Sequence, residues 1–360
     1  MAELTLRQLL EDMVQRRASD LHLTAGVPPE LRIDGAITPT EYEVLTPEKC
    51  IALAYSVLSN EQRKRFETTK ELDFSFGVKG LSRYRANVYL QRGVVSMAIR
   101  QIPYEIIAME KLGLPPIVRE FTNRQKGLVL VTGPTGSGKS TTLAAMLDKI
   151  NGTRQAHIMT IEDPVEYIHH HKKCIVNQRE VGADTASFPT ALKYVLRQDP
   201  DIILIGEMRD LETIEAALTI AETGHLVFAT LHTNSTYEAV NRIVDVFPSD
   251  QQKQILTQLA FTLEGVVTQQ LIPRSRGTGR VMVSEVLVCT PAIKAIIREA
   301  KVHQIYSLMQ AGQKYGMQTM NQGLLQAVLD KQLTPEDAMD RSTDRLELEG
   351  MLQKVLRPAA

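Results

Sequence analysis

The segment from Gly133 to Thr141 carries the clearest chemical signal in the chain, because it matches the GxxxxGK[ST] pattern of phosphate-binding loops. An apolar run precedes it and a helical pattern over residues 142–150 follows it. In that context main-chain N–H groups and the helix N-terminus face the phosphates of ATP. Lys139 would neutralise the β- and γ-phosphate oxygens, and Ser140 would offer its hydroxyl to Mg²⁺. The candidate nucleotide contacts are Gly133, Pro134, Thr135, Gly136, Ser137, Gly138, Lys139, Ser140 and Thr141.

A second candidate group is Glu207, which follows the apolar run from Asp201 to Gly206. This arrangement is typical of a Walker-B strand, which places a carboxylate beside the metal. Gly206 stands where many phosphate-loop proteins have an aspartate, so Glu207 must supply the carboxylate. It would either hold Mg²⁺ through water or orient the attacking water. The alternative is that Glu207 caps the next helix, because carboxylates favour the first turn of a helix.

An acidic cluster, Thr160-Ile-Glu-Asp-Pro-Val-Glu166, follows an apolar run at residues 157–161. Ligands of open parallel sheets bind at the carboxyl ends of the strands, so we expect these carboxylates at the same sheet edge as the phosphate-binding loop. Glu162 and Glu166 are both candidates for the base that activates water. The alternative is that they are ordinary loop acids.

Two histidines, His225 and His232, flank the apolar run at residues 226–231. At about 3.3 Å per residue they would lie roughly 23 Å apart, so they cannot share a metal. His232, at the carboxyl end of the run, could sense the γ-phosphate, whereas the position of His225 favours a structural role. Residues 169–171 are three further histidines, followed by lysines at 172–173. Adjacent side chains diverge in direction, so this segment predicts a solvated loop.

Three arginines, Arg83, Arg85 and Arg100, lie on predicted strands at residues 82–91 and 94–101. Arg83 and Arg85 are two residues apart and therefore share a strand face. An arginine supplied by a neighbouring subunit can stabilise the transition state of phosphoryl transfer, typically by a factor of about 10³–10⁵. The alternative is that these arginines form surface ion pairs.

Two patterns of secondary structure would position these groups. From Gly127 onward, apolar runs alternate with helical patterns, which predicts a parallel sheet with helices on both faces. The runs are residues 127–132, 157–162, 201–206 and 225–231. Upstream, helical patterns accompany partly alternating strands, which predicts an antiparallel sheet covered by helices. The helical patterns are residues 4–16 and 47–68, and the strands are residues 71–77, 82–91 and 94–101.

A stretch rich in Pro and Gly separates the two patterns, and we place a linker at residues 103–116. The chain from about residue 290 onward is nearly all helical in pattern, and Thr334-Pro335-Glu336 indicates a capped helix start. These signals predict an α/β protein with a first domain at residues 1–102, a second at 117–290 and a helical region at 291–360.

The composition narrows the functional classes. The 360 residues contain 41 Lys and Arg against 42 Asp and Glu, so the chain lacks the global basic field that a nucleic acid would need. Cys50, Cys174 and Cys289 lie far apart, which excludes a disulfide framework and a CxxC-type metal site. The apolar runs fall short of the roughly 18 residues that span a bilayer, and the start lacks a signal-peptide pattern. We therefore expect a cytoplasmic protein.

Taken together, four segments resemble the secretion-type ATPases, which are hexameric motors. The segments are 133–141, the Asp box at 160–166, the Gly-Glu form of Walker B at 204–210 and the His box at 224–235. Ser19-Asp-Leu-His22 in the first domain adds to the resemblance, which covers nearly the whole chain. Within this family the chain is most similar to the type IV pilus retraction ATPases of twitching motility. Assembly and type II secretion ATPases usually have an extra N-terminal domain and a four-cysteine metal segment, for which this chain is too short and too poor in cysteine. Residues 292–299, 302–305 and 312–320 resemble the C-terminal helices of the retraction group.

The resemblance implies a PAS-like α+β first domain, a RecA-like P-loop second domain and ATP at the subunit interface. Arg85 and Arg100 then correspond to arginines that reach that site from the first domain. Glu166 corresponds to the Asp-box base, and His225 and His232 to the His-box positions that contact the nucleotide.

The function that the resemblance implies is a homo-hexameric ring that hydrolyses ATP with Mg²⁺ and retracts pili. Its partners would be an inner-membrane platform protein and the pilin machinery, reached from the cytoplasmic face, with domain rotation about residues 103–116. The alternatives are a pilus assembly or type II secretion ATPase, a nucleic-acid translocase, and a regulatory partner that binds ATP but hardly hydrolyses it. The near-neutral charge, the lack of Trp and the 5% aromatic content argue against nucleic acid.

Overall fold

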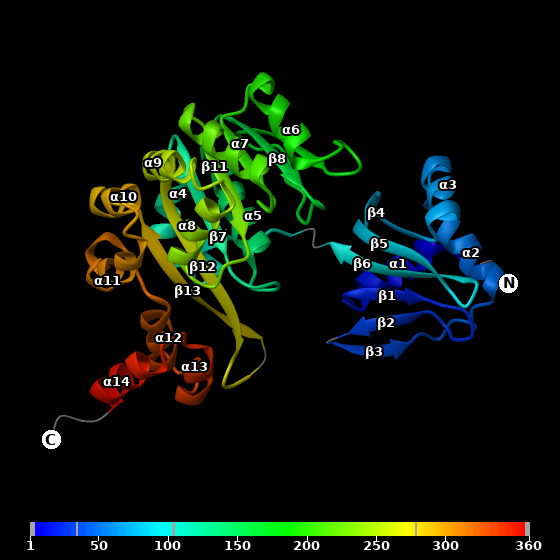
Figure 1. Cartoon of the computed structure of the whole chain (residues 1–360). Helices are drawn as coiled ribbons and strands as arrows, with labels where there is room; N and C mark the ends of the chain where they lie inside the picture. Colours follow the sequence, from blue (N-terminus) through cyan, green and yellow to red (C-terminus); the bar gives the residue numbers. More distant parts are fainter. Residues whose placement is uncertain (1–3, 34, 103–104, 278, 357–360) are drawn as a thin grey trace. The chain divides into compact units, whose positions relative to one another are not determined.

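The computed structural model describes residues 4–33, 35–102, 105–277 and 279–356. It divides into two compact units, Met1–Glu105 and Ile106–Ala360 (Figure 1). Residues 103–104 of the predicted linker lie outside the described residues. Met109, also within the predicted linker, is buried in the core of the second unit. The domain limits inferred from the sequence stay predictions.

The first unit is a six-stranded antiparallel sheet with helices. In spatial order the strands are β3 (Ala36–Pro39), β2 (Glu30–Ile33), β1 (Asp20–Leu23), β6 (Val94–Ile102), β5 (Ser82–Gln91) and β4 (Glu71–Val78). The helices are α1 (Leu6–Gln15), α2 (Pro47–Tyr55) and α3 (Asn60–Thr69).

Local sequence explains why these elements form. Thr5 caps α1 and exchanges hydrogen bonds with Gln8 in a capping box, and the leucines of α1 fall at helical spacing on its buried face. In β5, alternate residues such as Tyr84, Ala86 and Val88 are fully buried. The predicted antiparallel sheet covered by helices is therefore what the chain builds.

The second unit contains a seven-stranded sheet. In spatial order its strands are β13 (Arg280–Val288), β12 (Leu263–Pro273), β7 (Gly127–Thr132), β11 (Leu226–Leu231), β10 (Ile202–Ile205), β8 (His157–Glu162) and β9 (Ile175–Glu180). All neighbours are parallel except β13, which pairs with β12 in antiparallel fashion. The four predicted apolar strands are β7, β8, β10 and β11, whereas the sequence pattern does not indicate β9, β12 or β13.

Helices surround and extend this sheet. They are α4 (Ile117–Thr122), α5 (Lys139–Thr153), α6 (Phe188–Val195), α7 (Leu211–Glu222), α8 (Thr236–Asp245), α9 (Gln252–Thr262), α10 (Pro291–Arg298), α11 (Ile305–Ala311), α12 (Met320–Leu329), α13 (Pro335–Arg341) and α14 (Arg345–Leu356). Short 3₁₀ turns cover Met109–Lys111, Leu196–Gln198, Val302–Gln304 and Gln313–Tyr315. The predicted start at Thr334 is confirmed, because its side chain caps α13. Within the described part of the chain, no helix combines the length and apolarity that crossing a membrane would require.

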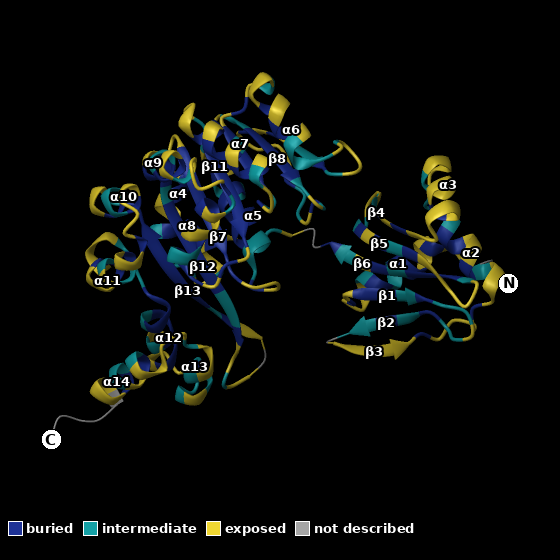
Figure 2. Cartoon of the chain, in the orientation of Figure 1, coloured by how far each residue is buried: buried dark blue, intermediate teal, exposed yellow. Residues whose placement is uncertain are grey.

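The core of the second unit lies at the middle of its sheet. Every residue of β7, β10 and β11 is buried, and Figure 2 shows β7 and β11 in dark blue. Successive side chains of a strand point to opposite faces, so burial of every residue means that both faces are covered. This packing fixes the carboxyl ends of the strands, where the candidate site residues lie.

One buried carboxylate ties the C-terminal helices to the sheet. Glu285 of β13 is 2% exposed and accepts hydrogen bonds from the N–H and hydroxyl of Thr236 at 2.7 and 2.8 Å, and from the N–H of Met320 at 3.2 Å. Burial raises the pKa of Glu285, and the hydrogen bonds from Thr236 and Met320 oppose that shift. The same side chain therefore fastens the starts of α8 and α12.

Candidate active site

A cavity of about 530 Å³ opens at the carboxyl ends of β7, β8, β10 and β11. The predicted site residues that line it are Thr135, Gly136, Gly138, Lys139, Ser140, Thr141, Glu162, Glu166, Glu207 and His232. Groups that the sequence analysis did not single out also line it, among them Tyr167, His169, Arg209 and Arg280. The structure thus brings together the phosphate-binding loop and both acidic segments.

The phosphate-binding loop, residues 133–138, joins β7 to α5 in a shape that depends on glycine. Gly133 has a φ of 136°, and a Cβ there would lie 2.3 Å from the carbonyl oxygen of Gln269. Gly138 has a φ of 88° and precedes the first residue of α5. Side chains at these positions would be strained, so the glycines of the motif are needed for the close packing of the loop on β12.

Gln269 of β12 forms hydrogen bonds with the phosphate-binding loop and with the start of α5. Its Nε2 donates to the carbonyl of Ser137 at 2.7 Å, and its Oε1 accepts from the Thr142 hydroxyl at 3.0 Å. Gln269 is 1% exposed, so both hydrogen bonds are shielded from water. The loop is therefore fixed to the neighbouring strand before any nucleotide binds.

The side chain of Lys139 forms hydrogen bonds with the phosphate-binding loop. Its Nζ donates to the carbonyl oxygens of Gly133 and Pro134 at 2.9 and 3.1 Å. Burial lowers the pKa of Lys139, while the charges of Glu207 and Glu166 act in the opposite direction. A triphosphate would offer this ammonium stronger acceptors than the carbonyls, because hydrogen bonds between ionised groups are the stronger kind.

Glu207 follows β10, and its carboxylate contacts the side chains of Arg209 and His232. Arg209 contacts both of its oxygens, with Nη2 at 2.7 Å from Oε2 and Nε at 2.6 Å from Oε1, and His232 Nε2 lies 3.3 Å from Oε1. Burial raises the pKa of Glu207, but the Arg209 hydrogen bond and the charges of His232, Arg209 and Lys139 outweigh it, and the net shift is downward. The helix-capping alternative is wrong, because Asp210 caps α7.

Glu162 is the last residue of β8 and Glu166 follows the strand; we call residues 162–169 the acid loop. The Oε1 of Glu162 accepts from the Thr160 hydroxyl at 2.6 Å and from Gln178 Nε2 at 3.2 Å. Burial nevertheless raises the pKa of Glu162 to about 7, although the hydrogen bonds from Thr160, Gln178 and the Glu166 backbone lower it. Glu166 is exposed and lines the cavity. Both carboxyl groups line the cavity, and the role of either as the base that activates water stays a prediction.

The two His-box histidines lie at opposite ends of β11. His232 follows the strand and lines the cavity, whereas His225 precedes the strand. The Nδ1 of His225 lies 3.1 Å from the Thr223 hydroxyl and 3.2 Å from the Ile220 carbonyl oxygen. This position does not support a contact between His225 and a nucleotide in the cavity of the same chain, and that contact stays a prediction.

His169 is a cavity residue that the sequence analysis missed. His170 and His171 are exposed, as the solvated-loop prediction states, but for His169 that prediction is wrong. His169 is 8% exposed, and its Nδ1 has no hydrogen-bond partner among the described residues. Burial lowers its pKa to about 4, so the ring is neutral at pH 7. Val165 and His169 are buried while Glu166 and His170 are exposed, and the burial of His169 results from tertiary packing that no local sequence pattern indicated.

A hydroxyl and a carboxylate in one cavity fit Mg²⁺. Ser140 is the second residue of α5, the ionised Glu207 faces the same cavity, and Mg²⁺ prefers a few oxygen ligands together with substrate phosphates. The described residues thus offer the predicted metal contacts.

The three candidate arginines lie in the first unit, Arg83 and Arg85 on β5 and Arg100 on β6. Arg85 of β5 is directly opposite Arg100 of β6 in the strand register, so both side chains stand on one face of the sheet. Arg100 Nε is 2.8 Å from Asp20 Oδ1, and Arg32 is 3.8 Å from the other oxygen of Asp20. Arg85 is exposed and makes no ion pair with the described residues.

Comparison with known proteins identifies the family. The family model described as "Type II/IV secretion system protein" matches residues 95–340. The chain belongs to this family. It is a secretion ATPase, and it is 48% identical over 337 residues to the type IV pilus retraction ATPase PilT of Pseudomonas aeruginosa, an alignment that covers 94% of this chain and 98% of that protein.

Further relatives agree with that assignment. The secretion ATPase is 43% identical to a twitching motility protein of Neisseria gonorrhoeae, over 91% of this chain and 89% of the relative. It matches the crystal structure of the pilus retraction motor PilT with bound ADP at a TM-score of 0.92 and 53% identity, over 97% of this chain and all of that one. These matches confirm the predicted family and fold class, a PAS-like α+β domain followed by a RecA-like P-loop domain with C-terminal helices.

Proposed function

We propose that this chain is an ATP-hydrolysing motor that powers the retraction of type IV pili. One observation carries the proposal: the phosphate-binding loop, the ionised Glu207 and the acid loop surround one cavity in a chain that resembles retraction ATPases over nearly its full length. The identity of 48% to PilT, against 34% to a type II secretion protein E and 34% to the pilus assembly ATPase PilB, supports retraction over the assembly and type II secretion alternatives.

The chemistry is the transfer of the γ-phosphoryl group to water. Main-chain N–H groups of the loop and Lys139 would hold the phosphates, and Ser140 and Glu207 would hold Mg²⁺, which supplies charge neutralisation when bound. Glu166 or Glu162 would take the proton of the attacking water. His232, beside Glu207, would contact the γ-phosphate and respond to its loss.

The working assembly that we propose is a homo-hexamer at the cytoplasmic face of the inner membrane. In this ring Arg85 and Arg100 of one subunit reach the ATP of its neighbour, and the domains rotate about residues 103–116. The exposure of both arginines supports the proposal. The ring would act on an inner-membrane platform protein and the pilin machinery, without binding nucleic acid.

Complementation in cells tests the function. The chain should restore twitching to a bacterial strain that lacks its retraction ATPase, and Lys139→Ala should not. Restored piliation of an assembly-deficient strain, with no effect on twitching, would instead assign the chain to pilus assembly. Retention of single-stranded DNA on filters would favour the translocase alternative.

Mixing of subunits tests the arginine contact between neighbours. Arg85→Ala and Lys139→Ala should each hydrolyse almost no ATP alone, because one lacks the arginine and the other lacks the phosphate grip. Mixed rings should regain phosphate release, since a Lys139→Ala subunit can supply its arginine to the intact site of an Arg85→Ala subunit. Arg65→Ala, at an exposed position on α3, is the matched control and should keep full activity. Mixed rings that stay inactive would exclude the contact.

A further inference from the structure

Gln178 stands beside the acid loop on β9. It is in register with Thr160 of β8, and the two side chains therefore project from the same face of the sheet. Both donate to the same oxygen, Oε1 of Glu162, at 2.6 Å from Thr160 and at 3.2 Å from Gln178. The orientation of the Glu162 carboxyl group thus depends on two neighbouring strands.

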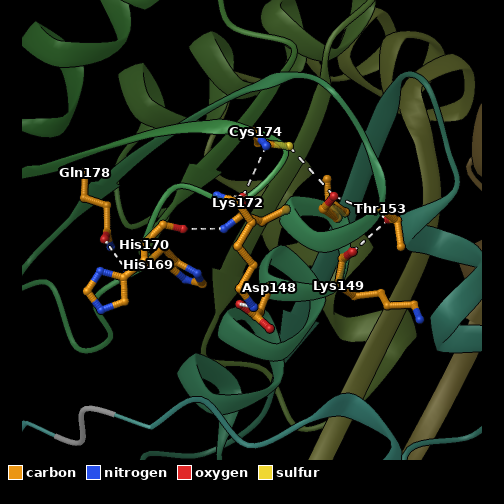
Figure 3. Close-up of polar contacts among 10 residues, drawn as sticks. Asp148, Lys149, Thr153, His169, His170, Lys172, Cys174 and Gln178 are labelled. Atoms are coloured by element: carbon orange, nitrogen blue, oxygen red, sulfur yellow. Dashed lines mark hydrogen bonds and ion pairs between the residues drawn. The ribbon is translucent and has the colours of Figure 1, made fainter.

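The rest of the Gln178 amide holds the main chain of the acid loop. Its Nε2 also donates to the carbonyl oxygen of Tyr167 at 2.8 Å, and its Oε1 accepts from the N–H of His169 at 2.8 Å. The latter hydrogen bond is drawn in Figure 3. A backbone residue of an adjacent strand would make this same pair of contacts on either side of Ile168. The Gln178 side chain therefore provides the hydrogen bonds that a neighbouring strand would otherwise provide, at a part of the loop beyond the paired residues of β8 and β9.

The acid loop is also joined to the phosphate-binding helix. The hydroxyl of Tyr167 lies 2.8 Å from the hydroxyl of Thr141, which is in the first turn of α5. The Glu162 carboxyl group and the Tyr167 carbonyl oxygen both accept hydrogen bonds from the Gln178 amide, and Glu166 lies between these two residues in the sequence. The position of Gln178 consequently sets the position of both candidate bases relative to the phosphates.

We infer that Gln178 is a positioning residue for ATP hydrolysis: its side-chain amide holds the acid loop so that Glu162 and Glu166 face the γ-phosphate. This inference rests on the proposed ATPase function. Gln178 does not line the cavity, so it acts through the acid loop and makes no contact with the nucleotide there. An amide is the group that fits, because it offers two donors and an acceptor at once.

Steady-state ATP hydrolysis by Gln178→Met tests the inference. Methionine keeps the length of the side chain but removes all three hydrogen bonds. We expect kcat to fall by about 10- to 100-fold, as for other residues that orient a catalytic group, while the KM for ATP and its calorimetric affinity stay near the wild-type values. Gln178→Glu keeps the acceptor for His169 and loses both donors, so its kcat should fall at least as far. It also provides the decisive measurement should Gln178→Met fail to fold.

Asn177→Leu is the matched control. Asn177 is the preceding residue of β9, and its Nδ2 contacts His157 Nε2 at 2.9 Å on the opposite face of the strand. Its kcat should match the wild type. Unchanged kcat in both Gln178 variants, or equal losses in Gln178→Met and Asn177→Leu, would overturn the inference. A wild-type chain that hydrolyses no ATP would instead overturn the proposed function.

Discussion

The phosphate-binding loop and the acid loop face one cavity but are supported in different ways. The phosphate-binding loop follows β7, which has a parallel strand on each side, and its shape comes from glycines and main-chain groups. The acid loop precedes β9, the last strand of the sheet, which pairs only with β8. Its shape depends on a side-chain amide, that of Gln178.

This difference separates nucleotide binding from turnover. Substitutions that disturb the phosphate-binding loop should lower the affinity for ATP. Substitutions of the acidic residues of the cavity should leave that affinity unchanged and lower kcat. Lys139→Ala and Glu207→Gln should show the two extremes of that division.

The largest effect is expected for Lys139→Ala. The ammonium is the cation of the phosphate-binding loop, and charged hydrogen bonds of this kind contribute about 1.5–3 kcal/mol, so ATP affinity should fall by about 10- to 100-fold. Phosphate release should be lost, and calorimetry would measure the affinity. Lys149→Ala, on the same helix with its Nζ 3.8 Å from Glu110, should change neither. Unaltered ATP affinity in Lys139→Ala would contradict the assignment of the grip.

Glu207→Gln should give the second-largest effect, on turnover alone. The amide keeps the size of the side chain but lacks the charge that Arg209 and His232 surround. Loss of a group that holds Mg²⁺ through water or orients the attacking water should lower kcat by about 10²–10⁴, with ATP binding retained. Glu215→Gln, exposed on α7, is the control. Equal losses in affinity and turnover would show that Glu207 belongs to the grip.

Glu162→Gln should change how stability depends on pH. The carboxyl group has a pKa of about 7 in the folded chain against an ordinary 4.5, so the stability that it contributes is complete below pH 4.5 and is lost as the pH rises through 7. Glutamine does not ionise. The variant should therefore gain up to about 3 kcal/mol relative to the wild type between these limits. Urea unfolding at pH 5 and pH 8 measures this gain, and an equal difference at both values would refute it.

The smallest effect is expected for Gln269→Met. It leaves the carbonyl of Ser137 and the hydroxyl of Thr142 without their partners, at a cost of about 1–3 kcal/mol in the free energy of unfolding. The KM for ATP should rise more than kcat falls, opposite to the pattern expected for Gln178→Met. Gln270→Met, at the next position of β12, is the control for thermal unfolding and kinetics. A kcat effect without a KM effect would remove the distinction between the two loops.

Local sequence patterns were sufficient to predict the fully buried strands and the phosphate-binding loop. The apolar run at residues 127–132 coincides with β7, and the motif at 133–141 identified the phosphate-binding loop. Strand β9 escaped prediction because its exposed and buried residues form no apolar run. His169 was misjudged because its burial results from the tertiary packing of an extended segment.

The two glutamines could not be recognised from the sequence. Gln269 contacts Ser137 from 132 positions away, and Gln178 contacts Glu162 from 16 positions away on the adjacent strand. No spacing rule links such pairs, since only the order of the strands brings them together. The placement of Glu162, Glu207 and His232 at one edge was predictable, because parallel strands share their carboxyl ends.

Asp20 gives Arg100 a resting partner. Its carboxylate binds Arg100 at 2.8 Å and lies 3.8 Å from Arg32, while the Arg100 side chain remains 70% exposed. When the paired Arg100 guanidinium binds a phosphate, it exchanges the Asp20 carboxylate for that phosphate. Because most of the Arg100 side chain is in water, its ion pair with Asp20 is weak enough to be exchanged readily, and the freed Asp20 keeps Arg32 as its neutralising neighbour.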